Sequence, residues 1–138
     1  MENERLQEAC RITMTITSSA YISGSPYFIF LMTKLVDLFI KKGFHAQAPY
    51  GCTAFANVIC AVIHDYDFAY DLGKLAIDLA DKEQSKFIKS KVVYVTNAGV
   101  FPWKRHYKEL LPMVHRHFKI AKDIGDLEFS GFNLYCYC

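Results

Sequence analysis

The chain has 138 residues, which is enough for one domain with its own hydrophobic core. Its apolar fraction of 52% and aromatic fraction of 15% exclude a disordered chain, and a net charge of +2 gives no electrostatic footprint for nucleic acid. We therefore expect one folded domain over residues 1–138 that binds no nucleic acid.

The five cysteines are an odd set, and four of them lie inside uncharged or aromatic runs, where a reduced cysteine behaves as a small buried hydrophobe. The first eleven residues are charged from Glu2 onward and lack the apolar stretch of a signal peptide. Both observations favour the reducing cytoplasm.

Apolar residues recur at intervals of three and four along most of the chain, and hairpin dipeptides are missing, which predicts an all-α fold of about seven helices. The predicted helices cover Asn3–Ser18, Pro26–Lys42, Pro49–Ile63, Tyr66–Lys82, Glu83 or Gln84 to about Ala98, Trp103 or Lys104 to Ile124, and Asp126 to the end. Prolines mark two helix starts, Gly43 and Gly125 mark two helix ends, and Asp65 is the expected N-cap of the fourth helix.

One uncharged stretch, residues 46–63, reaches the ~18-residue lower bound for a membrane span. It contains Pro49, Thr53 and Asn57, is rich in small residues and has no basic segment after it. We therefore expect a helix buried by protein on most sides and no membrane insertion.

The predicted helices form pairs that recur about every 40 residues, as in helical repeat arrays. Residues 33–42 align with residues 73–82, and residues 50–58 align with residues 130–138, which places Gly51 on Gly131. The spacing predicts antiparallel helix pairs stacked as a tetratricopeptide-like α-solenoid.

Small residues form a stripe on the fourth predicted helix, at Ala69, Gly73, Ala76 and Ala80. A second stripe on the third helix contains Gly51, Ala54, Val58 and Ala61. These stripes predict a close approach of the two helices.

Three short motifs suggest chemistry, but each is incomplete. Gly73-Lys74 lacks the first glycine and the hydroxyl residue of a phosphate loop, and Asp65, Asp67 and Asp71 lack the later glycine and glutamate of a calcium loop. His115 and His117 are two residues apart on a helix and so point in different directions. We predict no catalytic, metal-binding or cofactor-binding residue in this chain, and no cofactor.

Aromatic and basic residues are dense around the second and third helix pairs. Most of these aromatics should pack between helices, although helical arrays also use such residues to anchor a partner in a groove. The candidate groove or partner contacts are Tyr66, Tyr70, Trp103, Arg105, His106 and Tyr107.

The chain from about Tyr27 onward resembles the tetratricopeptide-like helical region of large bacterial multidomain signalling proteins. The residues that carry the resemblance are Tyr50-Gly51, Tyr70–Leu79, Trp103, Leu110-Leu111-Pro112, Gly125-Asp126-Leu127-Glu128 and Gly131. In that family a serine/threonine kinase and an AAA-type ATPase precede the helical region, and a GAF domain and often a histidine kinase follow it. The matched positions are packing and turn residues, so the resemblance implies architecture and parentage and no catalytic residue. Gly125 and Gly131 enter the predicted packing set on this basis.

The resemblance implies a non-catalytic scaffold, linker or interaction module within a signal-transduction kinase, with a protein partner or flanking domains of the same polypeptide as its contacts. The first predicted helix has no convincing N-cap and the C-terminal end has no polar closing face, so we expect a piece of a longer polypeptide whose ends can self-associate. The alternative is a small-molecule-binding or enzymatic helical domain with a pocket lined by Tyr66, Tyr70, Trp103, His106 and Tyr107; a pocket of about 300 Å³ or more would favour it.

Overall fold

The computed structural model describes residues 2–43 and 45–138, and this part of the chain contains helices and turns but no β-strand. The elements are α1 (Glu2–Ile22), α2 (Tyr27–Lys42), α3 (Ala48–Val58), the π-helical turn η1 (Ile59–Ile63), α4 (Tyr66–Glu83), α5 (Lys86–Gly99), the 3-10 turn η2 (Phe101–Trp103), α6 (Tyr107–Asp123) and α7 (Leu127–Tyr137). The predicted all-α fold is confirmed.

Local signals set most helix ends where the sequence predicts them. The side chains of Asp65 and Asp126 each accept a hydrogen bond from the backbone N–H three residues further on, which caps α4 and α7. Gly43 and Gly125 follow α2 and α6 with φ angles of 83° and 79°, a region that glycine adopts without a Cβ clash.

Several boundaries differ from the prediction. Helix α1 continues past Ser18 to Ile22, and the predicted third helix is divided into α3 and the wider turn η1, which ends at His64 with a φ of 62°. The sixth helix begins at Tyr107, because η2 intervenes and the His106 side chain caps the next turn. Within the described residues, every helix is too short or too polar to cross a bilayer.

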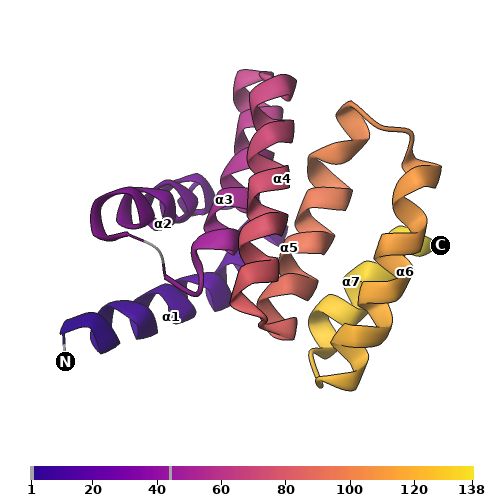
Figure 1. Cartoon of the computed structure of the whole chain (residues 1–138). Helices are drawn as coiled ribbons and strands as arrows, with labels where there is room; N and C mark the ends of the chain where they lie inside the picture. Colours follow the sequence, from indigo (N-terminus) through magenta and orange to yellow (C-terminus); the bar gives the residue numbers. More distant parts are fainter. Residues whose placement is uncertain (1, 44) are drawn as a thin grey trace.

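Neighbouring helices pack in pairs along the array, as Figure 1 shows for α3 beside α4 and for α6 beside α7. Helix α3 also packs against α5, and α5 packs against α7, so these three odd-numbered helices contact one another in sequence, and residues of α1 share a pocket with them. Between α3 and α5, the Thr53 and Thr96 hydroxyls form a buried hydrogen bond, and Thr96 donates its proton to the Val92 carbonyl. We call the surface formed by α1, α3, α5 and α7 the odd-helix face.

Helices α3 and α4 pack against each other, as their small-residue stripes predict, and the stripe of α4 is buried. Its glycine, however, approaches a different helix. Ala69, Ala76 and Ala80 are fully buried. A Cβ added to Gly73 would lie 3.1 Å from the Thr96 side chain and 3.2 Å from the Phe101 ring, which belong to α5 and η2. The close approach at this glycine therefore joins α4 to the α5–η2 segment.

In the stripe of α3, the glycine also approaches a helix other than α4. Ala54 is buried, and a Cβ added to Gly51 would lie 3.1 Å from the Leu35 Cβ of α2. Gly131, by contrast, is exposed on α7, and an added Cβ would contact nothing within 4 Å. Gly131 is therefore no close-packing position here, because no described element covers that side of α7.

Candidate functional site

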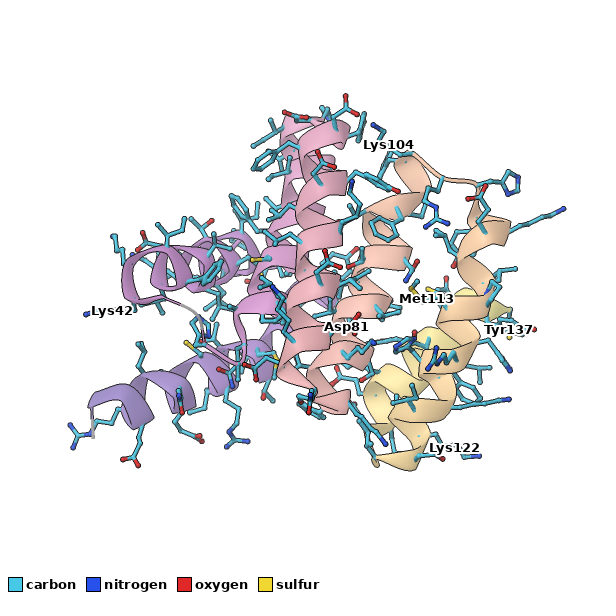
Figure 2. All side chains as sticks on the ribbon, viewed as in Figure 1. Lys42, Asp81, Lys104, Met113, Lys122 and Tyr137 are labelled. Carbon is cyan, nitrogen blue, oxygen red and sulfur yellow. The ribbon has the colours of Figure 1, made fainter. Side chains whose placement is uncertain are left out.

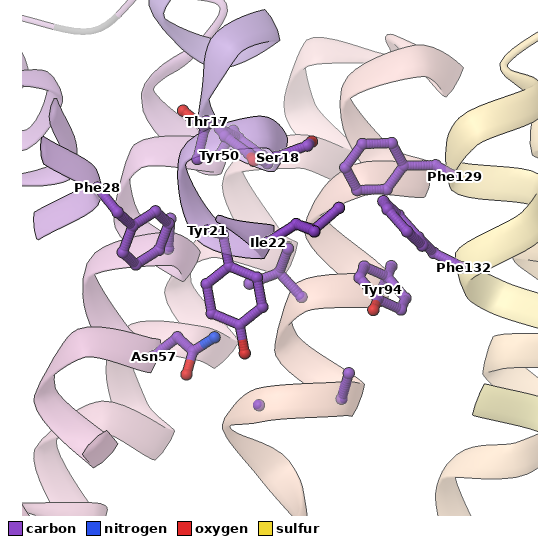
Figure 3. Close-up of a pocket in the computed structure, with 14 residues that line it drawn as sticks. Thr17, Ser18, Tyr21, Ile22, Phe28, Tyr50, Asn57, Tyr94, Phe129 and Phe132 are labelled. Carbon is purple, nitrogen blue, oxygen red and sulfur yellow. The ribbon is translucent and has the colours of Figure 1, made fainter. Parts of the chain in front are cut away.

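The candidate site is a cavity of about 140 Å³ on the odd-helix face, lined by residues of α1, α3, α5 and α7 and by one ring of α2. Figure 3 shows its side chains converging from these helices. Its aromatic lining residues are Tyr21, Phe28, Tyr50, Tyr94, Phe129 and Phe132. We call this space the aromatic cavity.

One wall of the aromatic cavity is a cluster of three rings from α5 and α7. Tyr94 stacks on Phe132 with ring centroids 5.2 Å apart, and Phe129 meets both rings edge-on at 5.7 Å and 5.4 Å. On the opposite side, Tyr21 and Phe28 lie 5.2 Å apart at a tilted angle. Such ring pairs add about 0.5–1.5 kcal/mol each beyond area burial, which favours a well-ordered wall.

A buried ion pair between Lys91 and Asp126 packs against the Phe129 ring of this wall. The Lys91 ammonium lies 3.0 Å from an Asp126 carboxylate oxygen and 3.7 Å from the centroid of the Phe129 ring, and both charged side chains are less than a tenth exposed. Burial lowers the pKa of Lys91, while the hydrogen bond to Asp126 opposes that shift. The pair ties α5 to the N-terminus of α7 and so fixes the position of Phe129.

The floor of the cavity consists of small residues where α3 meets α5. Ala54, Ala98 and Gly99 line it together with Asn57. A Cβ added to Gly99 would lie 2.6 Å from the Asn57 amide nitrogen, so the amide occupies the space that a larger residue at position 99 would fill. The absence of a side chain at Gly99 therefore allows a polar group to reach the cavity.

The lining residues carry no formal charge at neutral pH. Burial raises the pKa of Tyr50, and the nearby Glu128 carboxylate raises it further. Burial and the Cys136 thiol raise the pKa of Tyr94. Both phenols therefore stay neutral, and the cavity offers apolar surface with neutral hydrogen-bonding groups at its edge.

The residues predicted as groove contacts lie elsewhere, and none of them lines the aromatic cavity. Tyr66 and Trp103 stack with centroids 4.7 Å apart, and Tyr70 packs on Phe101, all near the start of α4. Lys104, which Figure 2 labels near the top of the view, follows Trp103 in the sequence and pairs with Asp67 of α4.

The other three predicted contacts have structural partners. Arg105 pairs with Glu109 one turn further along, and the His106 side chain caps α6. The Tyr107 hydroxyl donates to the Cys136 carbonyl at 2.7 Å, which joins α6 to α7. The structure thus brings Tyr66, Tyr70 and Trp103 into one cluster near the start of α4 but places Tyr107 at a separate helix contact.

The incomplete phosphate-loop and metal-binding motifs lie where the described part of the structure offers no ligand site. Within the described residues, no group of three His, Cys, Asp or Glu side chains is arranged to hold a metal ion. Lys74 is exposed and pairs with Asp71 at 2.8 Å on the same helix. Burial raises the pKa of the Cys52 thiol to about 11, so this thiol is protonated at neutral pH.

The sequence pattern does not predict the aromatic cavity. Its lining runs from Thr17 to Phe132, and periodicity within one helix cannot show which distant helix faces it. One usable signal was Asn57, an amide inside an otherwise uncharged and mostly apolar run, which is the kind of residue that marks a polar edge on a buried helix.

Searches against protein families, curated proteins and solved structures give no match to this chain. The candidate site therefore has to be interpreted from its own residues: an uncharged aromatic cavity on the odd-helix face of an all-α helical array.

Proposed function

We propose that this chain is a non-catalytic, tetratricopeptide-like helical module that binds a protein segment on its odd-helix face. The observation that carries the proposal is the aromatic cavity, where four successive odd-numbered helices place rings around one opening. Aromatic pockets of this kind supply the central contacts of many protein interfaces. The segment would come from a partner protein or from a flanking part of the same polypeptide.

The size of the cavity favours a protein segment over a free small molecule. Pockets for drug-sized ligands enclose about 300–1,000 Å³, whereas this cavity has about 140 Å³. One side chain of a larger partner fits such a space, and the exposed apolar residues around it can contact the rest of the segment. Tyr21 and Ile22 are among them, with 59% and 70% of their surfaces exposed.

The biological setting rests on the resemblance stated above. Under it, the module would act as a scaffold, linker or sensory region of a cytoplasmic bacterial signalling protein with kinase and ATPase domains elsewhere. Binding on the odd-helix face would change the spacing of the stacked helices slightly and so bias the domains on either side.

A peptide selection tests binding at this face. We expect a random peptide library selected on the wild-type chain to yield binders, and we expect Ile22→Glu to weaken them at least tenfold by fluorescence anisotropy, because the change places a charge at the opening. Ile40→Glu is the matched control, since Ile40 is 74% exposed on α2 and lies outside the cavity. Equal loss in both variants, or no binders at all, would contradict the proposal.

A further inference from the structure

We infer that the aromatic cavity receives one uncharged aromatic side chain of the bound segment, a phenol rather than a bare phenyl ring, with the Asn57 amide as its hydrogen-bond partner. This inference rests on the proposed function, because it names the chemistry of the partner at that same site. Four observations lead to it: the volume, the charge of the lining, the ring geometry of the walls and the unused amide.

The volume sets the size of the occupant. A buried apolar cavity of about 150 Å³ holds one benzene molecule, and the cavity here has about 140 Å³. One six-membered ring therefore fills it. The bicyclic indole of tryptophan is larger, and inserting it would force the surrounding helices apart at a cost of the kind that overpacking causes.

The charge of the lining sets the class of side chain. A cation or carboxylate placed in the cavity would lose its hydration without gaining a counter-ion, because the lining residues are all uncharged at neutral pH. The nearest buried cation, Lys91, is held by Asp126 behind the Phe129 ring. An aromatic ring, by contrast, can pack edge-to-face against Tyr94, Phe129 and Phe132.

The Asn57 amide supplies a hydrogen-bonding group at the floor of the cavity. It is half-buried at the floor of the cavity, held over Gly99, and it forms no hydrogen bond with any residue that the structure describes. Figure 3 shows the amide at the same end of the pocket as the Tyr21 hydroxyl. An amide can both donate to and accept from a hydroxyl, so a phenol inserted with its oxygen toward Asn57 gains a bond that a phenyl ring does not.

Side-chain analogues test the inference directly in the intact chain. In a titration followed by amide chemical shifts, we expect p-cresol and toluene, the analogues of tyrosine and phenylalanine, to cause saturable shifts at the cavity residues. We expect 3-methylindole and n-butylammonium, the analogues of tryptophan and lysine, to bind at least tenfold more weakly. Equal binding of all four compounds, or no saturable shift with p-cresol, would overturn the inference.

Two variants locate the binding and separate the role of the amide. Ala98→Leu fills the floor and should abolish both p-cresol and toluene binding, whereas Ala61→Leu, the same change at an exposed position outside the cavity, should leave both unchanged. Asn57→Leu should weaken p-cresol about three- to tenfold, the value of one neutral hydrogen bond, without weakening toluene. A parallel loss of both compounds in Asn57→Leu would overturn the role of the amide.

The peptides selected on the wild-type chain distinguish this inference from the proposed function. If they require Ile22 but tolerate both Ala98→Leu and the loss of their own aromatic residue, the odd-helix face binds protein and the inference about its occupant is wrong. If no peptides are selected, the proposed function fails, and the inference, which names a residue of that partner, fails with it. If p-cresol fails while the peptides bind at this face, only the inference fails.

Discussion

Helices α2 and α3 are both rich in apolar residues, yet they are buried to very different extents. In α3, nine of the eleven residues are buried, whereas in α2 only Met32 and Leu35 are buried among sixteen. Helix α3 packs against α2, α4 and α5, while α2 packs against α1 and α3. The number of neighbouring helices, more than composition, therefore decides how much of a helix the array buries.

This difference also explains where the cavity lies. The centre of the array can hold small residues, an uncharged helix and the buried Thr53–Thr96 hydroxyl pair because it is covered on several sides. The N-terminal pair leaves large apolar side chains in solvent, including Tyr27, Phe30 and Ile40. The aromatic cavity lies between these two regions, with α1 and α2 on one side of it and α5 and α7 on the other.

The largest expected effect comes from the buried ion pair of α5 and α7. Asp126→Asn keeps an N-cap residue on α7 but leaves the Lys91 charge buried without its partner. We expect a loss of about 3–5 kcal/mol in the free energy of unfolding, measured with urea. Asp37→Asn breaks the exposed Lys41–Asp37 pair on α2 and should cost less than about 1 kcal/mol. Similar losses of unfolding free energy in the two variants would contradict the expected difference between the buried and the exposed ion pair.

One substitution at two glycines should have opposite effects. Gly73→Leu forces a side chain against Thr96 and Phe101, and we expect a loss of about 1–3 kcal/mol from overpacking. Gly131→Leu meets open space within helix α7 and should gain up to about 1 kcal/mol from helix propensity. Thermal and urea unfolding measure both effects.

Lys74→Ala, next to Gly73 but exposed, should change the free energy of unfolding by less than about 0.5 kcal/mol.

The buried His117 predicts a loss of stability in acid. Burial lowers its pKa, the Lys89 and Arg116 charges lower it further, and the Met113 carbonyl and Asp81 oppose the shift. The unfolded chain therefore binds a proton more readily than the folded one, so stability falls as the pH drops from about 6.5 toward the lower pKa of the folded state.

Urea unfolding at pH 7.5 and pH 5.5 measures this effect. We expect His117→Gln to lose less stability between the two pH values than the wild-type chain loses, because glutamine does not titrate. An equal loss in both proteins would show that His117 does not carry the acid sensitivity.

The smallest effect should come from the exposed face of α2. Ile40→Glu, the control variant of the peptide experiment, should change the free energy of unfolding by less than about 0.5 kcal/mol, because Ile40 is 74% exposed. A loss above about 2 kcal/mol would mean that another element or a second copy of the chain covers this face in solution.

The sequence predicted the elements better than their contacts. Asp65, Asp126, Gly43 and Gly125 act through backbone groups within a few residues, so their roles are readable from local sequence. The turns η1 and η2 were missed, because π and 3-10 turns have weak local signals and depend on packing.

The candidate site was less predictable, for the same reason. Helices α3 and α4 pack together as the stripes predict, but Gly73 itself approaches α5 and η2, since periodicity identifies a buried face and not every helix that covers it. The aromatic density around Tyr66 and Trp103 predicts a groove near the start of α4. The cavity instead combines residues more than a hundred positions apart, such as Thr17 and Phe132.

The contact of Asn57 with Gly99 has a consequence for natural variation. The amide lies where any Cβ at position 99 would be, so substitution at either position constrains the other. Descendants of this sequence that acquire alanine or serine at position 99 should also carry a smaller residue at position 57, and those that keep the amide should keep glycine. Paired changes at positions 57 and 99 would thus record, across lineages, whether the polar edge of the cavity has been retained.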